Sequence, residues 1–349
     1  MNQLTKHRMI LALAVAVLFS LAPFGVSLAT ITGTCSNCHT MHNSEGGQVA
    51  ARRINSAHSG LESDTTPNAA LLRRDCAGCH SASAAGTWKE QTTGAPIVFN
   101  FSNPTNPLAG GNFKYVVDSD SKGHNVTGVA NADGNFSSRN IPGSATAYFQ
   151  VGCAGERGCH GDRSSGKTDV GGMKGAHHSP APDILDGTSL GRSYRFLKGI
   201  AGVEDVYWEY DAKESRGHNV YKGTTTGSTD SISYLCSQCH GNFHTWQGGS
   251  LEVGTQSPWL RHPTDAVLKN SGEYAAYTSY NLTAPVARPD PYNGDVQQTL
   301  VRPGTDIVMC LSCHRAHGSP NYKMIRWDYK STSLSTALSG CNVCHTSKN

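Results

Sequence analysis

Six short segments of this sequence carry the residues best suited to chemistry, two cysteines followed at once by a histidine. Numbered in chain order, they are site 1 with Cys35, Cys38 and His39, site 2 with Cys76, Cys79 and His80, site 3 with Cys153, Cys159 and His160, site 4 with Cys236, Cys239 and His240, site 5 with Cys310, Cys313 and His314, and site 6 with Cys341, Cys344 and His345. Paired cysteines alone would indicate disulfides or zinc, but neither explains the histidine after every pair. The CxxCH pattern is typical of c-type haem, because two thiols one helical turn apart can form thioethers with its two vinyl groups while the histidine ligates the iron.

Site 3 departs from this spacing. Its sequence CAGERGCH places five residues between Cys153 and Cys159, where the other sites have two. Haem attachment there requires the three extra residues to loop out without separating the sulfurs, and a disulfide between the two cysteines is the alternative. We therefore expect six haems, or five if this pair is a disulfide.

Further histidines are available as second iron ligands. Each site histidine fills one face of its iron, and the ligand on the other face decides between electron transfer and catalysis. His42 and His317 follow sites 1 and 5 in the pattern CHxxH, where the second histidine cannot reach its own iron but can reach a neighbouring one. His124 and His218 repeat the tetrapeptide GHNV, which favours a repeated role. The remaining candidates, in decreasing order of strength, are His262, His244 and then the weaker group of His58, His178 and the adjacent His177.

This supply of histidines exceeds the six that are needed. Every haem can therefore be bis-histidine, a ligation that favours low-potential electron transfer over oxygen chemistry. For any single candidate the alternative is a surface or hydrogen-bonding histidine.

The rest of the chain predicts little regular structure to position these sites. Glycine accounts for 38 of 349 residues, and segments 93–113 and 283–295 are rich in Pro, Gly and Asn, which is typical of loops. We expect short helices around the CxxCH motifs, a longer helix near residues 264–279 and few strands. No domain boundary is visible, so residues 30–349 are predicted to form one multihaem cytochrome c domain, with the haems as its core.

Residues 1–29 have the features of a secretory signal, with two basic residues, an apolar run over residues 9–22 and the small pair Ser27 and Ala29 at the cleavage site. Its removal leaves 27 of the 29 basic side chains against 26 acidic ones. This nearly neutral charge does not indicate nucleic-acid binding. No later segment approaches the roughly 20 apolar residues of a membrane-spanning helix. We expect an exported protein at the outer cell surface or beyond it, with the periplasm as the alternative.

The order of the motifs carries a resemblance to a known family. The motifs are CSNCHTMHNS at 35–44, GHN at 123–125, CSQCH at 236–240 followed by His244, RHP around His262, CLSCHRAHGS at 310–319 and a terminal CNVCH. Together they resemble the hexahaem outer-surface cytochromes of metal-reducing bacteria, which polymerise into conductive filaments. The resemblance implies six bis-histidine haems in a row of alternating stacked and perpendicular pairs. It also implies that His42 ligates, in an adjoining copy of the chain, the haem attached through Cys310, Cys313 and His314.

These patterns favour an electron-transfer protein over an enzyme. The leading hypothesis is a conduit that works with partner cytochromes and delivers electrons to extracellular acceptors such as Fe(III) oxides, in its sharper form as a filament subunit. The alternatives are a discrete periplasmic or surface carrier, and a multihaem reductase of a small oxyanion such as nitrite with one open iron face. The sequence contains no CxxCK variant and no GxSxG, Walker or zinc-protease signature.

Overall fold

The computed structural model of this chain describes residues 31, 33–136, 138–211, 217–244, 261–292 and 299–347. The expected signal segment, residues 1–29, lies outside them. Within the described ranges, no helix is both long enough and apolar enough to cross a membrane.

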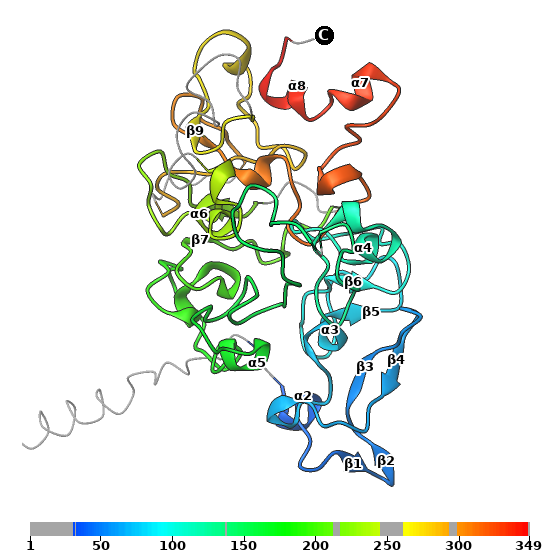
Figure 1. Cartoon of the computed structure of the whole chain (residues 1–349). Coiled ribbons are helices and arrows are strands. Elements are labelled where there is room, and N and C mark those ends of the chain that lie inside the picture. Colours follow the sequence, from blue (N-terminus) through cyan, green and yellow to red (C-terminus); the bar gives the residue numbers. More distant parts are fainter. Residues whose placement is uncertain are drawn as a thin grey trace, which may run out of the picture.

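Turns and irregular segments make up most of the described chain, and its helices are short (Figure 1). The α-helices are α2 (Cys35–Cys38), α3 (Cys76–Cys79), α4 (Lys114–Asp118), α5 (Asp169–Gly172), α6 (Ile232–Ser237), α7 (Leu334–Ala337) and α8 (Cys341–Cys344). The 3-10 helices are η1 (Ala69–Leu71), η2 (Asp120–Lys122), η3 (Leu190–Arg192), η4 (Tyr194–Phe196), η5 (Gly241–Phe243), η6 (Gly272–Tyr274), η7 (Cys310–Ser312) and η8 (Tyr322–Met324). Short helices therefore lie at five of the six cysteine motifs, the exception being site 3, and the predicted loop-rich fold class is confirmed.

The strands within the described residues form five two-stranded sheets. The pairs are β1 (Ser44–Glu45) with β2 (Gln48–Val49), β3 (Arg52–Ile54) with β4 (Leu61–Ser63), β5 (Ser81–Ala82) with β6 (Phe99–Asn100), β7 (Gly202–Val203) with β8 (Val220–Tyr221), and β9 (Ala266–Val267) with β10 (Ile307–Val308). Only the β5–β6 pair is parallel among them. Sheets of this size tie loops together locally and cannot by themselves form a core.

The longer helix predicted near residues 264–279 is wrong. The segment instead contains strand β9 and the 3-10 helix η6. Val267 pairs with Ile307 across the β9–β10 ladder, and Gly272 has a φ of 62°, outside the right-handed helical region. Tertiary strand pairing and a left-handed glycine thus override the local helical preference.

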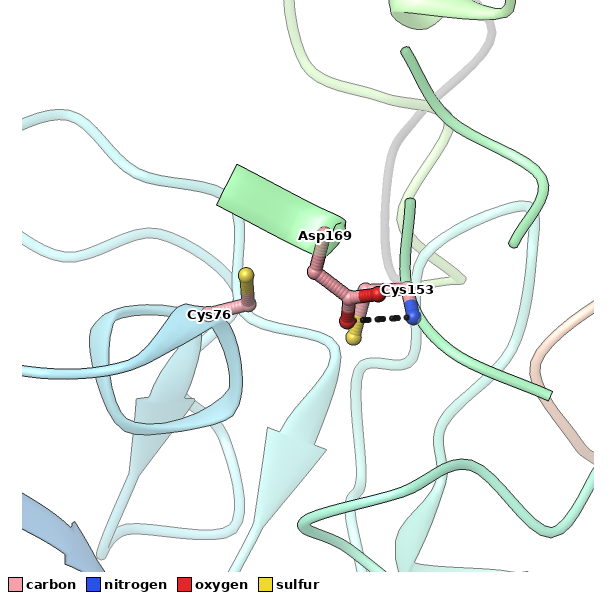
Figure 2. A group of neighbouring side chains, drawn as sticks. All are labelled: Cys76, Cys153 and Asp169. Carbon is pink, nitrogen blue, oxygen red and sulfur yellow. Dashed lines mark hydrogen bonds between the residues drawn. The ribbon is translucent and has the colours of Figure 1, made fainter. Parts of the chain in front are cut away.

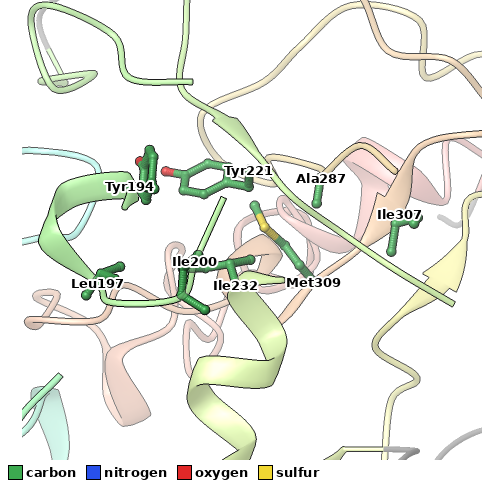
Figure 3. Packing of buried hydrophobic residues seen from close by; sticks show 8 residues of the cluster. All are labelled: Tyr194, Leu197, Ile200, Tyr221, Ile232, Ala287, Ile307 and Met309. Carbon is green, nitrogen blue, oxygen red and sulfur yellow. The ribbon is translucent and has the colours of Figure 1, made fainter. Parts of the chain in front are cut away.

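Small clusters of buried side chains anchor the cysteine motifs. The first cluster, shown in Figure 3, consists of Tyr194, Leu197, Ile200, Tyr221, Ile232, Ala287, Ile307 and Met309. Ile232 lies on α6, which carries Cys236, and Met309 directly precedes Cys310. This cluster therefore fixes sites 4 and 5 relative to each other.

Two further clusters do the same for other sites. One contains Ala77, which lies between the cysteines of site 2, packed with Phe99 and Phe113. The other contains Leu268 and Tyr277 and packs against Cys344 of site 6. The described side chains thus form several local cores, each beside an attachment motif. Along the molecule, α2 lies at one end and α8 at the opposite end, so the first and last sites are far apart (Figure 1).

Candidate haem-binding sites

A single backbone hydrogen bond defines the local geometry of the regular sites. In each, the histidine N–H donates to the carbonyl oxygen of the first cysteine. The N···O distances are 2.8 Å for His39, 3.0 Å for His80, 2.9 Å for His240, 3.2 Å for His314 and 2.8 Å for His345. This turn places the two thiols about one helical turn apart, as thioether attachment to one haem requires.

Site 3 closes the same hydrogen bond in spite of its three extra residues. The His160 N–H donates to the Cys153 carbonyl at 3.0 Å, and a turn from Gly155 to Gly158 takes up the additional length. Gly155 has a φ of 72°, and an added Cβ would come within 2.6 Å of two backbone oxygens, so only glycine fits there. The widened motif therefore presents its histidine as the regular ones do, and Cys153 and Cys159 are both free thiols.

The carboxylate of Asp169 supports this widened motif. It accepts the Cys153 N–H at 3.1 Å, shown by the dashed line in Figure 2. Asp169 is the first residue of α5, and the preceding Thr168 caps that helix by accepting the Gly171 N–H at 3.1 Å. The sequence pattern gave no sign of this support, because Asp169 lies nine residues beyond the end of the motif.

Every site histidine uses its Nδ1 for a hydrogen bond within the protein. The partners are backbone carbonyls at five sites and a carboxylate at the sixth. The distances are 3.0 Å from His39 to Ala70, 2.8 Å from His80 to Pro96, 2.9 Å from His160 to Arg195, 2.7 Å from His240 to Pro142, 3.0 Å from His314 to Lys323, and 3.1 Å from His345 to Oε1 of Glu273. A bonded Nδ1–H leaves Nε2 as the donor atom, which is the usual arrangement of metal-ligating histidines.

At three of these sites the accepting carbonyl belongs to a left-handed residue that is not glycine. Ala70, Arg195 and Lys323 have φ values of 56°, 49° and 56°, and the residue after each is also left-handed. This conformation costs an L-residue about 1–2 kcal/mol. Its recurrence at sites 1, 3 and 5 marks a repeated device that orients alternate site histidines, and no glycine in the sequence announces it.

Five site histidines face a second histidine ring. The ring centroids are 6.2 Å apart for His39 and His178, 6.4 Å for His80 and His177, 6.4 Å for His160 and His317, 6.2 Å for His240 and His124, and 6.2 Å for His345 and His262. A first-row metal held between two imidazole nitrogens at about 2.0–2.1 Å would put the centroids roughly 6.3 Å apart. The spacing of these pairs therefore fits one iron between each two rings, and the donor set fits haem c.

Burial keeps several of these imidazoles in the neutral form that binds metal. It lowers the pKa of His317 to about 3 and that of His177 to about 4. Burial also lowers the pKa of His124 and of His160. His177, which the sequence placed in the weakest group, is thus positioned like the stronger candidates, and with the adjacent His178 it faces the histidines of two neighbouring sites.

Site 5 differs from the others. Among the described residues, which include every histidine after residue 30, no second ring faces His314 at this spacing. His42 is exposed, and no contact of its ring with another described residue is found. The neighbouring Met41 is 84% exposed. The chain thus contains one site without an internal second histidine, and one exposed candidate, His42, whose ring faces no other described histidine.

Three other candidates lie away from the site histidines. His218 is buried, stacks on Tyr280 at 4.3 Å and has its Nδ1 3.5 Å from a carboxylate oxygen of Glu209. His244 is buried and is paired through Nε2 with Asp265. His58 is half-buried with its ring 6.3 Å from Phe99. The GHNV repeat therefore does not place its two histidines in equivalent surroundings.

The first three sites follow one another in space. The Arg73 N–H donates to the carbonyl of Cys38 at 2.8 Å, while the Cys79 thiol donates to the adjacent Arg74 carbonyl at 3.8 Å, which joins sites 1 and 2. Sites 2 and 3 meet at Cys76 and Cys153, whose sulfurs lie with a carboxylate oxygen of Asp169 within 4.8 Å of one another (Figure 2).

The same order continues from site 3 to site 5. The Arg163 guanidinium donates to the Cys159 carbonyl at 3.1 Å and to the Gln238 side chain at 3.4 Å, and so joins sites 3 and 4. At the next junction the Cys310 N–H donates to the hydroxyl of Ser233 on α6 at 3.3 Å, and interaction with the nearby Cys236 thiol lowers the pKa of Cys310.

Site 6 adjoins site 5. Burial, with a contribution from the nearby Cys344 and Cys341 thiols, raises the pKa of Cys313 to about 12. The six sites thus form a row in which neighbouring sites follow the order of the sequence.

Comparisons with known proteins agree with this geometry. A family model described as the doubled CXXCH motif matches residues 303–349, which contain sites 5 and 6. No curated protein matches the chain. A solved structure of the Outer Membrane Cytochrome S filament from Geobacter sulfurreducens matches at 18% identity with a TM-score of 0.53, covering 92% of this chain and 100% of that one. A structure of the OmcS nanowires from the same organism matches at 18% identity with a TM-score of 0.51 and the same coverage. The resemblance predicted from the motifs is confirmed at the level of the fold, which is that of an OmcS-like multihaem cytochrome.

Proposed function

We propose that this chain is an exported electron-transfer protein that holds six c-type haems in a row and assembles into filaments. The observation that carries the proposal is the pairing of five site histidines with five further histidines at 6.2–6.4 Å. When bound, the haems supply one-electron transfer between neighbouring irons. The chain holds them by two thioethers each, orients their ligands and brings consecutive sites into contact.

In this proposal each of the five histidine pairs would hold the iron of one haem. Bis-histidine ligation leaves no open face for a substrate, which favours electron transfer over reduction of a small molecule. Haem attachment at site 3 is supported by its closed backbone turn and by the His160–His317 pair, which has the same spacing as the others.

The sixth haem, at site 5, takes its second ligand from another copy of the chain. His42 is the candidate, because it is exposed and no described residue is found against its ring. A bond from His42 of one copy to the iron beside His314 of the next would link assembly and electron transfer in one contact. The two solved structures that share this fold are of a filament and of nanowires, which supports this form of assembly over a discrete carrier.

The exported location rests on the signal-like segment 1–29 and on the fold shared with an outer membrane cytochrome. A row of haems that continues from copy to copy would carry electrons away from the cell. Partner cytochromes would deliver these electrons, and extracellular oxidants such as Fe(III) oxides would accept them.

The His42→Ala variant tests the assembly. We expect it to retain six haems by intact mass and to unfold within about 0.5 kcal/mol of the native protein, but to form no ordered fibres under the electron microscope. Its ferric spectrum should gain the signature of one haem with an open or water-bound face, and added imidazole should remove that signature without restoring fibres.

The matched control is His58→Ala, which removes a histidine that faces no site histidine. Fibres should persist in it. Ordered fibres from His42→Ala would remove His42 as the bridging ligand, and a mass with five haems would leave site 3 unoccupied. A native protein that stays monomeric would favour the discrete carrier, and one that binds nitrite or cyanide when assembled would favour the reductase.

A further inference from the structure

The hydrogen bond to Nδ1 of the site histidine differs at site 6 from that at the other five sites. There the acceptor is the carboxylate of Glu273, whose Oε1 lies 3.1 Å from Nδ1 of His345. Every other site histidine bonds a neutral backbone carbonyl at 2.7–3.0 Å. The six sites thus contain a built-in comparison between a charged and a neutral acceptor.

Glu273 is held firmly in this position. It lies in η6, and its own backbone carbonyl accepts both the Thr346 N–H at 3.1 Å and the Thr346 hydroxyl at 2.6 Å. Thr346 directly follows His345, so Glu273 is bonded to the histidine ring through its side chain and to the next residue through its carbonyl. The Tyr274 ring packs on the His345 ring with centroids 4.9 Å apart. The side chains of His345 and Glu273 are only 15% and 20% exposed, which limits screening by water.

A carboxylate is a stronger acceptor than a carbonyl, and hydrogen bonds to it are charge-assisted. It draws the Nδ1 proton toward itself, and the imidazole becomes a more basic ligand at Nε2. A more basic ligand stabilises the oxidised metal more than the reduced metal. Hydrogen bonding around the axial ligand is one of the means by which a protein sets a haem potential.

We propose that Glu273 is a positioning residue that lowers the reduction potential of the haem at site 6 relative to the sites with carbonyl acceptors. The inference rests on the proposed function, because it requires haem at site 6. Since the sites are arranged in chain order, site 6 is one end of the row, and the low-potential haem would recur once in every copy of the chain at the junction with the next.

The second ligand of the same site provides a way to observe it separately. The His262 and His345 ring planes are 90° apart, whereas the other four histidine pairs have interplanar angles of 24–43°. Perpendicular imidazole planes give low-spin ferric haem a more anisotropic electron paramagnetic resonance signal, with a larger maximum g value, than nearly parallel planes. The site 6 haem can therefore be followed in a redox titration of the whole holoprotein.

The test is the Glu273→Gln variant, which keeps an oxygen acceptor of the same size but removes its charge. At a fixed potential and pH, we expect the ratio of reduced to oxidised haem at site 6, calculated from the loss of the ferric anisotropic signal, to rise about tenfold, equivalent to about 59 mV for a one-electron couple. The signals of the other haems should move by less than about twofold.

The matched control is Asp328→Asn, which removes an exposed carboxylate next to Trp327, whose ring packs near Gly340 at the start of site 6. It should change the ratio by less than about twofold, because Asp328 contacts no ligand. Equal shifts in both variants, or no shift in Glu273→Gln, would overturn the inference.

Intact mass separates this failure from failure of the proposed function. If both variants and the native protein carry six haems and the potentials are unchanged, only the role of Glu273 is lost. If site 6 of the native protein carries no haem, the proposed function itself fails.

Discussion

The two CHxxH segments of this chain share a local pattern but lie in opposite surroundings. His317 follows site 5, packs on Phe113 with ring centroids 4.7 Å apart, and faces His160 of site 3. His42 follows site 1 in the same spacing and lies exposed on the surface. The spacing prevents the second histidine from reaching the iron of its own site. The surrounding chain determines whether its ring faces another site histidine of the same molecule.

The difference between the two segments lies in the backbone around them. Around His317 the chain packs closely, since the His317 N–H donates to the Gly110 carbonyl at 2.7 Å and the Asn112 N–H donates to the Gly318 carbonyl at 3.0 Å. After His42 the chain turns through Gly46 and Gly47, where an added Cβ would meet nothing within 4 Å. Close backbone packing fixes His317, whereas the open hairpin after His42 leaves that histidine exposed.

The largest effect on stability is expected from adding a methyl group to the closely packed backbone around His317. Gly111 has a φ of 85°, and an added Cβ would overlap the backbone carbonyl of Gly318. The Gly111→Ala variant should lose about 3 kcal/mol or more of unfolding free energy, because both the left-handed strain and the clash must be relieved. Denaturant unfolding measures this loss.

Gly46→Ala is the matched control at the other segment. Its φ of 58° carries the same kind of strain but no clash, so the cost should be about 1–2 kcal/mol. Equal losses in the two variants would mean that the close packing at Gly111 does not distinguish the segments.

Removal of the His317 side chain should have the next largest effect. The His317→Ala variant loses the ring packed on Phe113 and the second ligand of site 3, and we expect a loss of about 2–3 kcal/mol. One haem should gain an open-face spectrum in the isolated protein. His42→Ala should leave the stability of the isolated chain within about 0.5 kcal/mol of the native value. A similar loss of stability in both variants would show that His42 also has a partner within its own chain.

The parts of the sites that were predictable from sequence are those fixed by neighbouring residues. The cysteine pairs, their histidines and most of the short helices around them follow from a spacing of a few residues. The loop-rich fold follows from the content of glycine, proline and asparagine. The position of His177 and His178 does not, because they meet His80 and His39 across 97 and 139 residues of mostly irregular chain. No periodic pattern connects such segments, and only the three-dimensional path brings the rings together.

The GHNV repeat also shows that local sequence does not determine which residues a histidine contacts. His124 faces His240 of site 4 and bonds the Ala316 carbonyl at 2.8 Å through Nδ1. His218, in the identical tetrapeptide, packs between Tyr280 and the buried carboxylate of Glu209. The repeated sequence does not determine the partner of each ring, which comes from another part of the chain. Likewise, Glu273 lies 72 residues from the histidine that it contacts.

The smallest expected effect on stability comes from replacing the two histidines of the GHNV repeat, His124 and His218. The His124→Ala variant should convert the haem of site 4 to an open-face form, because it removes a ring 6.2 Å from His240. The His218→Ala variant should leave every haem spectrum unchanged and cost only about 1–2 kcal/mol, because it deprives the buried Glu209 of one neighbour. Part of that cost is offset, since Glu209 also accepts hydrogen bonds from Asn219 and, at 3.2 Å, from the Tyr221 hydroxyl. An altered haem spectrum in His218→Ala would instead give the second GHNV histidine the same ligand role as the first, and visible spectroscopy of the two purified variants decides between these outcomes.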